Sequence, residues 1–234
     1  VLRDAGRLDE SIEQFRQAQQ LQPDGTVALD NTLFIMTYDA SYSPDDYVRA
    51  ARRYGRLLTA QARQPVGTSP APSKRSGDIL RVGLVSGDLR DHPVGYFLEN
   101  VLSHLDPGRI DLVAYPTTRE EGQLTARIRP HFSLWRPLVG LDDHEAADRI
   151  RDDGIDILID LAGHTANNRL SLFAWKPAPV QVTWLGYWAS TGVAEIDFIL
   201  ADPVSVPASC ESQFTEAVWR LPDTRLCPSP LDDS

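Results

Sequence analysis

The chain has few cysteines and no long apolar run. Its 234 residues include only Cys210 and Cys227, too few for a disulfide framework and without the spacing of a metal site. We predict that both thiols are reduced and buried. No stretch approaches the roughly 20 apolar residues that a membrane-spanning helix needs, and the amino-terminal region lacks the apolar centre of a signal peptide. These absences predict a cytoplasmic protein that does not bind membranes.

Positive charge is also scarce. The 33 acidic residues outnumber the 23 lysines and arginines and give a formal net charge of −10. Nucleic acids and anionic membranes attract basic surfaces, so we expect neither as a partner. An anionic ligand must therefore be held by a local group of side chains. The length and the 42% apolar composition allow one well-buried core and a smaller appendage.

Several catalytic signatures are missing as well. The first expected strand is followed by SGDLRDHPVG instead of GxGxxG, which argues against an NAD enzyme. The sequence has neither the GxxxxGK(S/T) loop of P-loop NTPases nor the GxSxG elbow of α/β hydrolases. Since no pair of histidines has the spacing of a metal site, we predict no metal.

Residues 1–24 predict a helix that ends before Pro23. One of its faces is formed by Leu8, Ile12, Phe15, Ala18 and Leu21. A second set of residues, Gly6, Ser11, Phe15, Ala18 and Pro23, matches the second half of a tetratricopeptide repeat, and a plain amphipathic helix is the alternative. Because a half-repeat cannot bury its own face, and because the chain does not start with methionine, we expect a fragment of a longer protein with more repeats before Val1.

A helical extension is predicted over residues 25–64. Its first helix, Val27 to Tyr38, is apolar almost all round and should be buried. Its second helix should end near residue 62 and begins with capping residues. These are Ser43 at the N-cap, Pro44 at the first helical position and Asp46 at the third.

Residues 65–78 are rich in proline and poor in apolar side chains, which is typical of a linker. Beyond them, over residues 79–234, short apolar strands alternate with helices, which predicts a doubly wound, mostly parallel α/β sheet. The expected strands cover residues 79–86, 110–115, 132–134, 155–161, 180–185 and 196–201. The expected helices lie near residues 94–104, 121–129, 143–152 and 168–175.

Reactive side chains follow three of these strands. His92 comes after the first strand and immediately before Pro93, His164 follows the fourth strand, and Tyr187 and Thr191 follow the fifth. Because the carboxyl ends of parallel strands meet at one edge, we expect these loops to converge. An imidazole there can serve as a general base or as a hydrogen-bond donor. Taken alone, a loop histidine before a helix is more often a cap or a surface residue than a functional group.

The remaining titratable residues are given structural roles. His104, His131 and His144 are expected to be structural or exposed. Four aspartates near strand ends are expected to bond their own loops, in preference to binding Mg²⁺ or acting as bases. They are Asp88, Asp91, Asp160 and Asp202.

Several ordered segments between residues 79 and 230 resemble one family: RVGLVSGDLRDHPVGYF, AADRIRDDGIDILIDLAGHT, KPAPVQVTWLGY and FILADPVSVP. They are similar to the catalytic region of nucleocytoplasmic protein O-linked N-acetylglucosamine transferases and their SPINDLY-type relatives. The resemblance implies a Rossmann-like amino-terminal lobe of a glycosyltransferase B type fold, preceded by tetratricopeptide-like helices. It implies inverting transfer of a sugar, here N-acetylglucosamine from UDP-GlcNAc, to Ser or Thr of a protein acceptor. The nucleotide sugar is a substrate, and no cofactor is implied.

The resemblance also assigns residues. His92 matches the family's active-site histidine, and His164 falls in a loop of the same cleft, where some members carry tyrosine. We therefore predict His92 and His164 as catalytic. The predicted substrate-binding residues are Pro93, Thr165, Tyr187, Thr191 and Gly192. Trp188 stands where many relatives have proline, which leaves the preferred sugar and acceptor open.

The resemblance implies a second lobe after Ser234 that makes most nucleotide contacts, so we expect this chain alone to be inactive. One alternative is an O-fucosyltransferase that uses GDP-fucose. A second is a non-enzymatic tetratricopeptide-type scaffold with a degenerate transferase lobe. A third is a small-molecule α/β enzyme unrelated to sugars. The repeats could also mediate oligomerisation.

Overall fold

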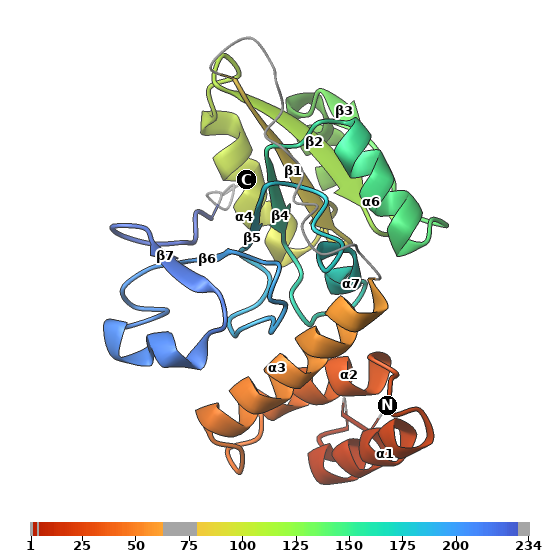
Figure 1. Ribbon diagram of the computed structural model, residues 1–234. Coiled ribbons are helices and arrows are strands. Elements are labelled where there is room, and N and C mark those ends of the chain that lie inside the picture. The colour runs from red at the N-terminus through yellow and green to blue at the C-terminus, as the bar shows by residue number, and fades with distance from the viewer. Residues whose placement is uncertain (1, 4, 63–78, 229–234) are drawn as a thin grey trace.

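Three helices lead into a seven-stranded sheet with helices on both faces (Figure 1). The computed structural model describes residues 2, 3, 5–62 and 79–228, and the predicted linker over residues 65–78 lies outside them. The helices are α1 (Leu8–Leu21), α2 (Val27–Met36), α3 (Pro44–Gln61), α4 (Pro93–His104), α5 (Gln123–Ile128), α6 (Asp143–Asp152) and α7 (Leu170–Phe173). The strands are β1 (Leu80–Ser86), β2 (Ile110–Pro116), β3 (Leu134–Trp135), β4 (Ile157–Asp160), β5 (Val180–Thr183), β6 (Phe198–Ala201) and β7 (Ala217–Arg220).

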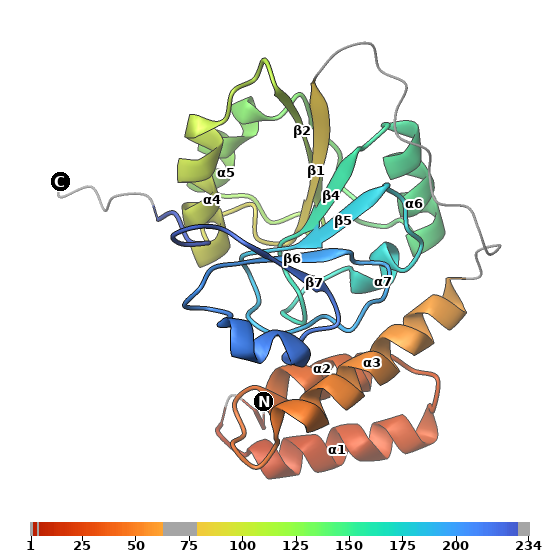
Figure 2. The same ribbon diagram turned by 60° about the vertical axis from the view of Figure 1, so that its left-hand side comes forward.

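The sheet is parallel throughout, with the strand order β3-β2-β1-β4-β5-β6-β7. The chain builds outward from β1 to β3 and then returns to the other side of β1 as β4. Figure 2 shows α4 and α5 on one face of the sheet and α6 and α7 on the other. Such a reversal leaves a crevice beyond the carboxyl ends of β1 and β4, where ligands of doubly wound folds bind.

The predicted doubly wound sheet is confirmed, with two local differences. The sequence did not reveal β7, because its AVWR segment is short and leaves Trp219 56% exposed instead of forming a buried apolar run. Strand β3 is also shifted by two residues from the predicted 132–134. Phe132 packs against the ring of Trp135, with their centroids 5.4 Å apart, instead of joining the strand.

The predicted start of α3 is confirmed. The hydroxyl of Ser43 accepts a hydrogen bond from the Asp46 N–H at 3.2 Å, and the Asp46 carboxylate accepts one from the Ser43 N–H at 2.9 Å. This reciprocal pair satisfies two backbone donors that a helix start would otherwise leave open. In α1, Ile12 is buried but Leu21 is 85% exposed. Part of its apolar face is therefore uncovered, and the tetratricopeptide assignment stays a prediction.

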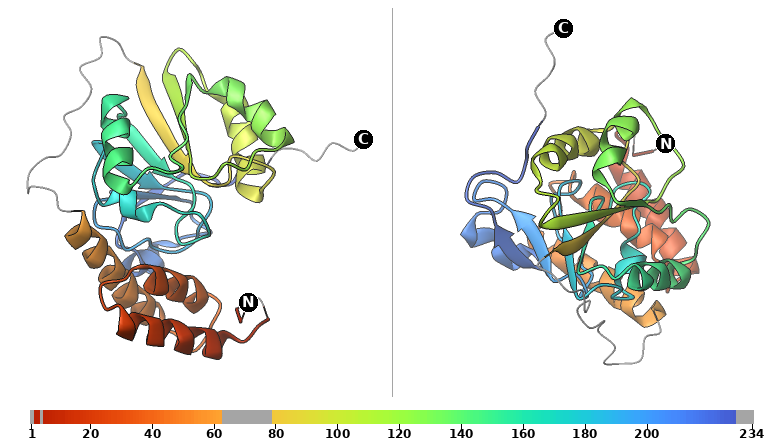
Figure 3. Two further views of the ribbon diagram at one scale, coloured as in Figure 1. Left: turned by 90° about the vertical axis from the view of Figure 1, so that its right-hand side faces the viewer. Right: turned by 90° about the horizontal axis from the view of Figure 1, so that it is seen from above.

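Helices α2 and α3 pack directly against the lobe. Figure 3 shows the three amino-terminal helices as a layer at one end of the sheet. Leu33 of α2 and Leu58 of α3 belong to the same hydrophobic cluster as Tyr187 and Ile196 of the lobe. The predicted boundary between a helical extension and a lobe therefore does not separate two hydrophobic cores.

Two glycines allow α3 to approach the loop after β5. A Cβ atom on Gly55 would lie 1.8 Å from the carbonyl oxygen of Gly192, and one on Gly192 would lie 2.1 Å from the carbonyl oxygen of Ala51. Gly192 also has a φ of +77°, which side-chain-bearing residues rarely adopt. This packing accounts for a glycine at position 192, and its predicted contact with substrate stays a prediction.

The prediction for the cysteines was half wrong. Both thiols are free, but Cys210 and Cys227 are only partly buried. Cys227 lies in the segment after β7, where its sulfur accepts a hydrogen bond from the Asn100 side chain at 3.1 Å. Among the described helices, none is long and apolar enough to cross a bilayer.

Candidate functional site

His92 forms the N-cap of α4. Its Nδ1 accepts a hydrogen bond from the Val94 N–H at 3.3 Å, and Pro93 follows as the first helical residue. Because Nδ1 accepts, a neutral ring carries its hydrogen on Nε2 and can donate it. The His92 side chain is 37% exposed. This donor can therefore reach a molecule bound at the sheet edge.

Asp88 lies behind His92. One carboxylate oxygen is 3.7 Å from Nδ1 of His92, and the other is 3.6 Å from the guanidinium of Arg90. Burial raises the pKa of the Asp88 carboxyl, and the neighbouring His92 and Arg90 side chains oppose that rise. Asp88 is only 5% exposed, so it acts on His92 electrostatically instead of contacting a ligand.

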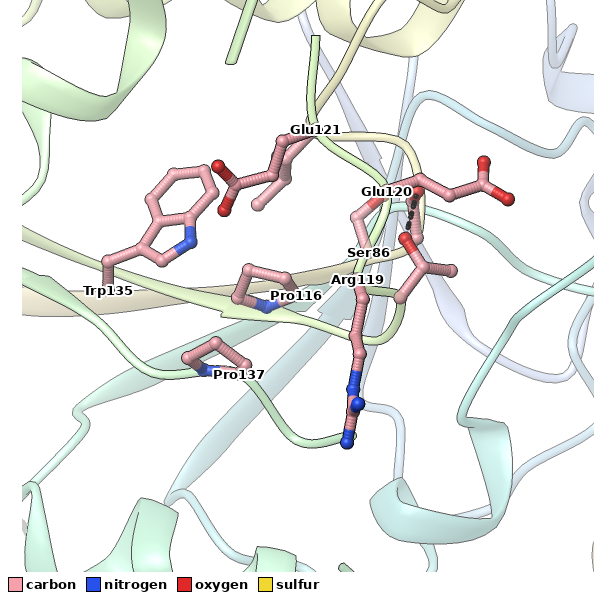
Figure 4. A pocket seen from close by; sticks show the side chains of 10 residues that line it. Ser86, Pro116, Arg119, Glu120, Glu121, Trp135 and Pro137 are labelled. Atoms are coloured by element: carbon pink, nitrogen blue, oxygen red, sulfur yellow. Dashed lines mark hydrogen bonds between the residues drawn. The ribbon is translucent and has the colours of Figure 1, made fainter. Parts of the chain in front are cut away.

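A pocket of about 140 Å³ opens beside the same loop. Ser86, Pro116 and Trp135 place it at the carboxyl ends of β1, β2 and β3. Figure 4 shows the Trp135 indole and the Glu121 carboxylate on one side of this pocket, with Arg119 on the other. The indole Nε1 is buried and has no hydrogen-bond partner among the described residues. An acceptor oxygen of a small polar ligand would satisfy it.

His164, in the loop after β4, has no exposed side-chain surface. Its Nδ1 lies 2.5 Å from a carboxylate oxygen of Asp30 in α2, and its Nε2 lies 3.0 Å from the carbonyl oxygen of Thr191. The rings of Tyr54 and Tyr187 pack edge-on against it, with centroids 4.9 and 5.3 Å away. Both ring nitrogens are therefore engaged inside the protein.

The loop after β5 is enclosed by α3 on one side. The hydroxyl of Tyr187 lies 3.1 Å from that of Tyr47, which donates to the carbonyl oxygen of Ser190 at 2.7 Å. Burial raises the pKa of both tyrosines above the ordinary phenol value. Both therefore serve as neutral hydrogen-bonding groups.

Glu216 encloses the same loop from the side of β7. Its carboxylate accepts hydrogen bonds from the Thr191 N–H and from the Ser190 hydroxyl, each at 2.7 Å, and from the Thr191 hydroxyl. Glu216 and Thr191 are both buried. A buried carboxylate is stable only where several groups donate hydrogen bonds to it, and here Ser190 and Thr191 of the loop after β5 do so.

The predicted meeting of three loops is correct only in part. His164, Tyr187 and Thr191 do come together, but among the described residues no hydrogen bond or ring contact joins His92 to them. Tyr187, Thr191 and Gly192 are buried against α2, α3 and Glu216, and their contact with substrate stays a prediction. Pro93 is exposed and Thr165 half-buried, so for these two a substrate contact stays a prediction.

Two residues of this region, Asp30 and Glu216, could not be predicted from the sequence. Asp30 is 134 residues from its partner His164, and Glu216 is 25 residues from Thr191. Neither lies in a motif. Asp30 comes near His164 only because α2 packs on the lobe, and Glu216 comes near Thr191 only because β7 joins the sheet. No signal in the sequence could have found them.

A second, polar pocket of about 420 Å³ lies between α2 and the loop after β4. Asp30 and His164 line it together with side chains that carry hydroxyl or amide groups. These are Thr26, Asn31, Thr165, Asn167, Asn168 and Ser171. Groups that both donate and accept suit a peptide backbone or the hydroxyls of a sugar.

Of the four aspartates at strand ends, Asp160 and Asp202 bond their own loops as predicted, whereas Asp91 accepts from the distant Leu124 N–H at 3.4 Å and Asp88 pairs with Arg90 and His92. Asp160 accepts hydrogen bonds from the N–H groups of Ala162 and Gly163 at 3.0 and 2.9 Å and from the Thr183 hydroxyl at 2.8 Å. Burial raises the pKa of Asp160, and these donors oppose the rise. Within the described ranges, no three His, Cys, Asp or Glu side chains are grouped so as to hold a metal ion.

Asp202 gives a pH-dependent prediction. The N–H groups of Ser205 and Arg225 lower the pKa of Asp202 to about 2. Since an unfolded aspartate titrates near 3.9, its charge stabilises the fold above roughly pH 4, and that contribution is lost as the pH falls toward 2. Asp202→Asn should lower the free energy of unfolding by about 1.5 kcal/mol at pH 7.

The loss caused by Asp202→Asn should shrink steadily as the pH is lowered from about 5 to 3. Urea unfolding at each pH measures it, and Asp223→Asn, at an exposed position, is the matched control. A loss that is independent of pH would show that the charge of Asp202 does not contribute.

Comparison with known proteins settles the family. The sequence profile of glycosyl transferase family 41 matches residues 58–227. The chain belongs to this family. A probable UDP-N-acetylglucosamine–peptide N-acetylglucosaminyltransferase SPINDLY of Oryza sativa subsp. japonica is 34% identical over 227 residues, which are 95% of this chain and 24% of that protein. The UDP-N-acetylglucosamine–peptide N-acetylglucosaminyltransferase of Caenorhabditis elegans is 32% identical over 65% of this chain and 13% of its own length.

A solved structure agrees with this family 41 assignment. A mutant O-GlcNAc transferase of Thermobaculum terrenum superposes with a TM-score of 0.91 at 35% identity, over 99% of this chain and 44% of its own. The predicted Rossmann-like fold is thus confirmed. The family 41 chain spans about a quarter of the length of the SPINDLY relatives that it matches.

Trp188 lies where the family 41 lobe meets α2. Its ring is 5.7 Å from that of Tyr38 and 6.3 Å from that of Phe34, and 44% of the residue is exposed. Trp188 therefore closes the outer side of the contact between α2 and the loop after β5.

Proposed function

We propose that this chain is the amino-terminal catalytic part of a protein O-glycosyltransferase. The reaction is the inverting transfer of N-acetylglucosamine from UDP-GlcNAc to Ser or Thr of a protein acceptor. The observation that carries the proposal is the match to an O-GlcNAc transferase structure over 99% of this chain at 35% identity. The names of the plant and nematode relatives support the same donor and a peptide acceptor.

The geometry of His92 supports a role in this reaction. In inverting transfer the acceptor oxygen bonds to the anomeric carbon, the bond from that carbon to the diphosphate oxygen breaks, and the hydroxyl proton passes to the departing diphosphate or to solvent. His92 stands at the crevice between β1 and β4 with Nε2 directed away from its own helix cap. A neutral ring donates from Nε2 to a substrate oxygen that gains negative charge, which lowers the barrier.

The proposal extends to the acceptor peptide, the location of the protein and its partners. The polar pocket bordered by Asn31 and Thr165 suits the backbone of an acceptor peptide. Pro93 lies at the open end of α4, where it could contact substrate. The net charge of −10 supports a protein without nucleic-acid or anionic-membrane partners, and a cytoplasmic location is a further part of the proposal. We also propose that the amino-terminal helices mediate oligomerisation.

The test is a transfer assay on this chain joined to the remaining length of its relatives, called here the extended protein. It is incubated with a peptide library and with UDP-GlcNAc or GDP-fucose, each labelled in the sugar. We expect label on Ser or Thr from UDP-GlcNAc, and none when the 234-residue chain is used alone. Label from GDP-fucose only would replace the proposed donor. Peptide binding without label from either donor would point to a scaffold.

A further inference from the structure

We propose that His164 is a positioning residue that ties α2 to the loop after β5, instead of exchanging a proton with the substrate. This departs from the catalytic role that the family resemblance implies. The structural part of the proposal stands on contacts between described residues. The effect of His164 on turnover rests on the transferase function proposed above.

The hydrogen bonds of His164 leave no lone pair for a substrate. A carbonyl oxygen can only accept, so the 3.0 Å contact with Thr191 requires a hydrogen on Nε2. Nδ1 lies 2.5 Å from the carboxylate of Asp30, so this nitrogen is also engaged in a hydrogen bond inside the protein. A general base needs a lone pair within reach of the proton that it takes. In this arrangement His164 has none.

The surroundings hold the ring in place. Tyr54 of α3 and Tyr187 pack edge-on against its faces, and its side chain is completely buried. The buried carboxylate of Asp160 lies nearby, and His164 is among the groups that oppose the rise that burial causes in the pKa of Asp160. Turning the ring toward a ligand would break both hydrogen bonds and leave Asp30 without its partner, which is costly for a partly buried carboxylate.

The loop after β5 is clamped from two sides. The carbonyl oxygen of Thr191 binds His164, while its N–H and hydroxyl bind Glu216. Ser190 adds a hydrogen bond to the same carboxylate at 2.7 Å. The clamp fixes this loop to β7 on one side and, through His164 and Asp30, to α2 on the other.

The hydrogen bonds of His164 to Asp30 and Thr191, called here the tie, set the width of the polar pocket. Asn31 of α2 forms one wall, and Thr165 and Asn168 of the loop after β4 form the other. The Asn168 side chain also donates to Asp30 at 3.1 Å, so the carboxylate holds both walls. Without His164, α2 and the lobe would be free to shift relative to each other, and misplacement by about 1 Å can lower a rate 100-fold.

The first experiment needs no activity. The 234-residue chain is labelled with ¹⁵N in its histidine rings, and ring N–H signals are recorded by NMR. We expect a slowly exchanging Nε2–H signal from His164, identified by its loss in His164→Gln and by its proximity to the rings of Tyr54 and Tyr187. The exposed His144, 3.6 Å from Asp148, is the control and should give no such signal. A folded chain without a protected His164 signal would overturn the tie.

The second experiment separates positioning from proton transfer in the extended protein. His164→Gln keeps one hydrogen-bond donor, whereas His164→Ala keeps none. We expect kcat/KM for the acceptor to fall by about 10- to 100-fold in the alanine variant, mainly through KM, with partial recovery in the glutamine variant. The pH profile of kcat should keep its shape.

An equal loss of kcat in both variants, with a changed pH profile, would make His164 a catalytic group and overturn the proposal. His144→Gln controls for the loss of a histidine elsewhere. If the extended protein transfers no sugar at all, the proposed function fails, while the NMR result still decides whether His164 forms the tie.

Discussion

Replacement of His92 by alanine in the extended protein is expected to lower the rate of sugar transfer by about 100- to 10,000-fold. The structure places its Nε2 beyond the carboxyl end of β1, with the side chain 37% exposed and the Asp88 carboxylate behind it. Alanine removes this donor and also removes the cap of α4. Initial rates of label transfer from UDP-GlcNAc to an acceptor peptide measure the loss.

His92→Asn separates these two effects. Asparagine is among the best N-cap residues, so it should keep α4 intact while it removes the imidazole. We expect it to be as inactive as alanine but more stable by about 1 kcal/mol. His131→Ala, at an exposed position in a short 3₁₀ turn, is the matched control and should transfer sugar normally. An asparagine variant with near-normal activity would limit His92 to its role as a cap.

Gly55→Ala is expected to lower the free energy of unfolding by roughly 3 kcal/mol or more. A helix glycine replaced by alanine usually gains up to about 1 kcal/mol. Here the added methyl group would lie 1.8 Å from the carbonyl oxygen of Gly192, and backbone on both sides must move to admit it. Urea unfolding of the 234-residue chain, followed by circular dichroism, measures the change.

Arg56→Ala is the matched control for Gly55→Ala. It lies next along α3, is exposed, and should change the free energy of unfolding by less than about 0.5 kcal/mol. A Gly55→Ala chain as stable as the original would mean that α3 does not press against the loop after β5. The layer formed by α1 to α3 would then not be fixed to the lobe in the way that the structure shows.

Local features of this fold could be predicted because their causes lie within a few residues. The start of α3 depends on Ser43 and Asp46, which are three residues apart and bond each other. The start of α4 at Pro93 depends on a ring that already has a helical φ. Central strands such as β1 are mostly apolar because both faces of the sheet are covered. Strand β7, at the edge and partly exposed, lacks that pattern.

The candidate site also contains one residue whose position the sequence predicts and one whose position it does not. His92 could be placed at the sheet edge from its position after β1, and its cap follows from the next two residues. The interior position of His164 could not be predicted, because it depends on Asp30 in a helix 134 residues away. The loop motif around His164 looks the same in the sequence whether the ring faces a ligand or a neighbouring helix.

The sequence by itself therefore determined the family, the alternation of strands and helices, and the position of His92, because motifs and periodicity are local properties of the chain. Only the tertiary structure decided that α2 and α3 pack against the loop after β5 and bury Tyr187, Thr191 and His164. That contact needs the close approach of Gly55 and Gly192, and the hydrogen bonds that Asp30 and Glu216 complete. Each of these joins residues that are distant in the chain, so folding alone brings them together.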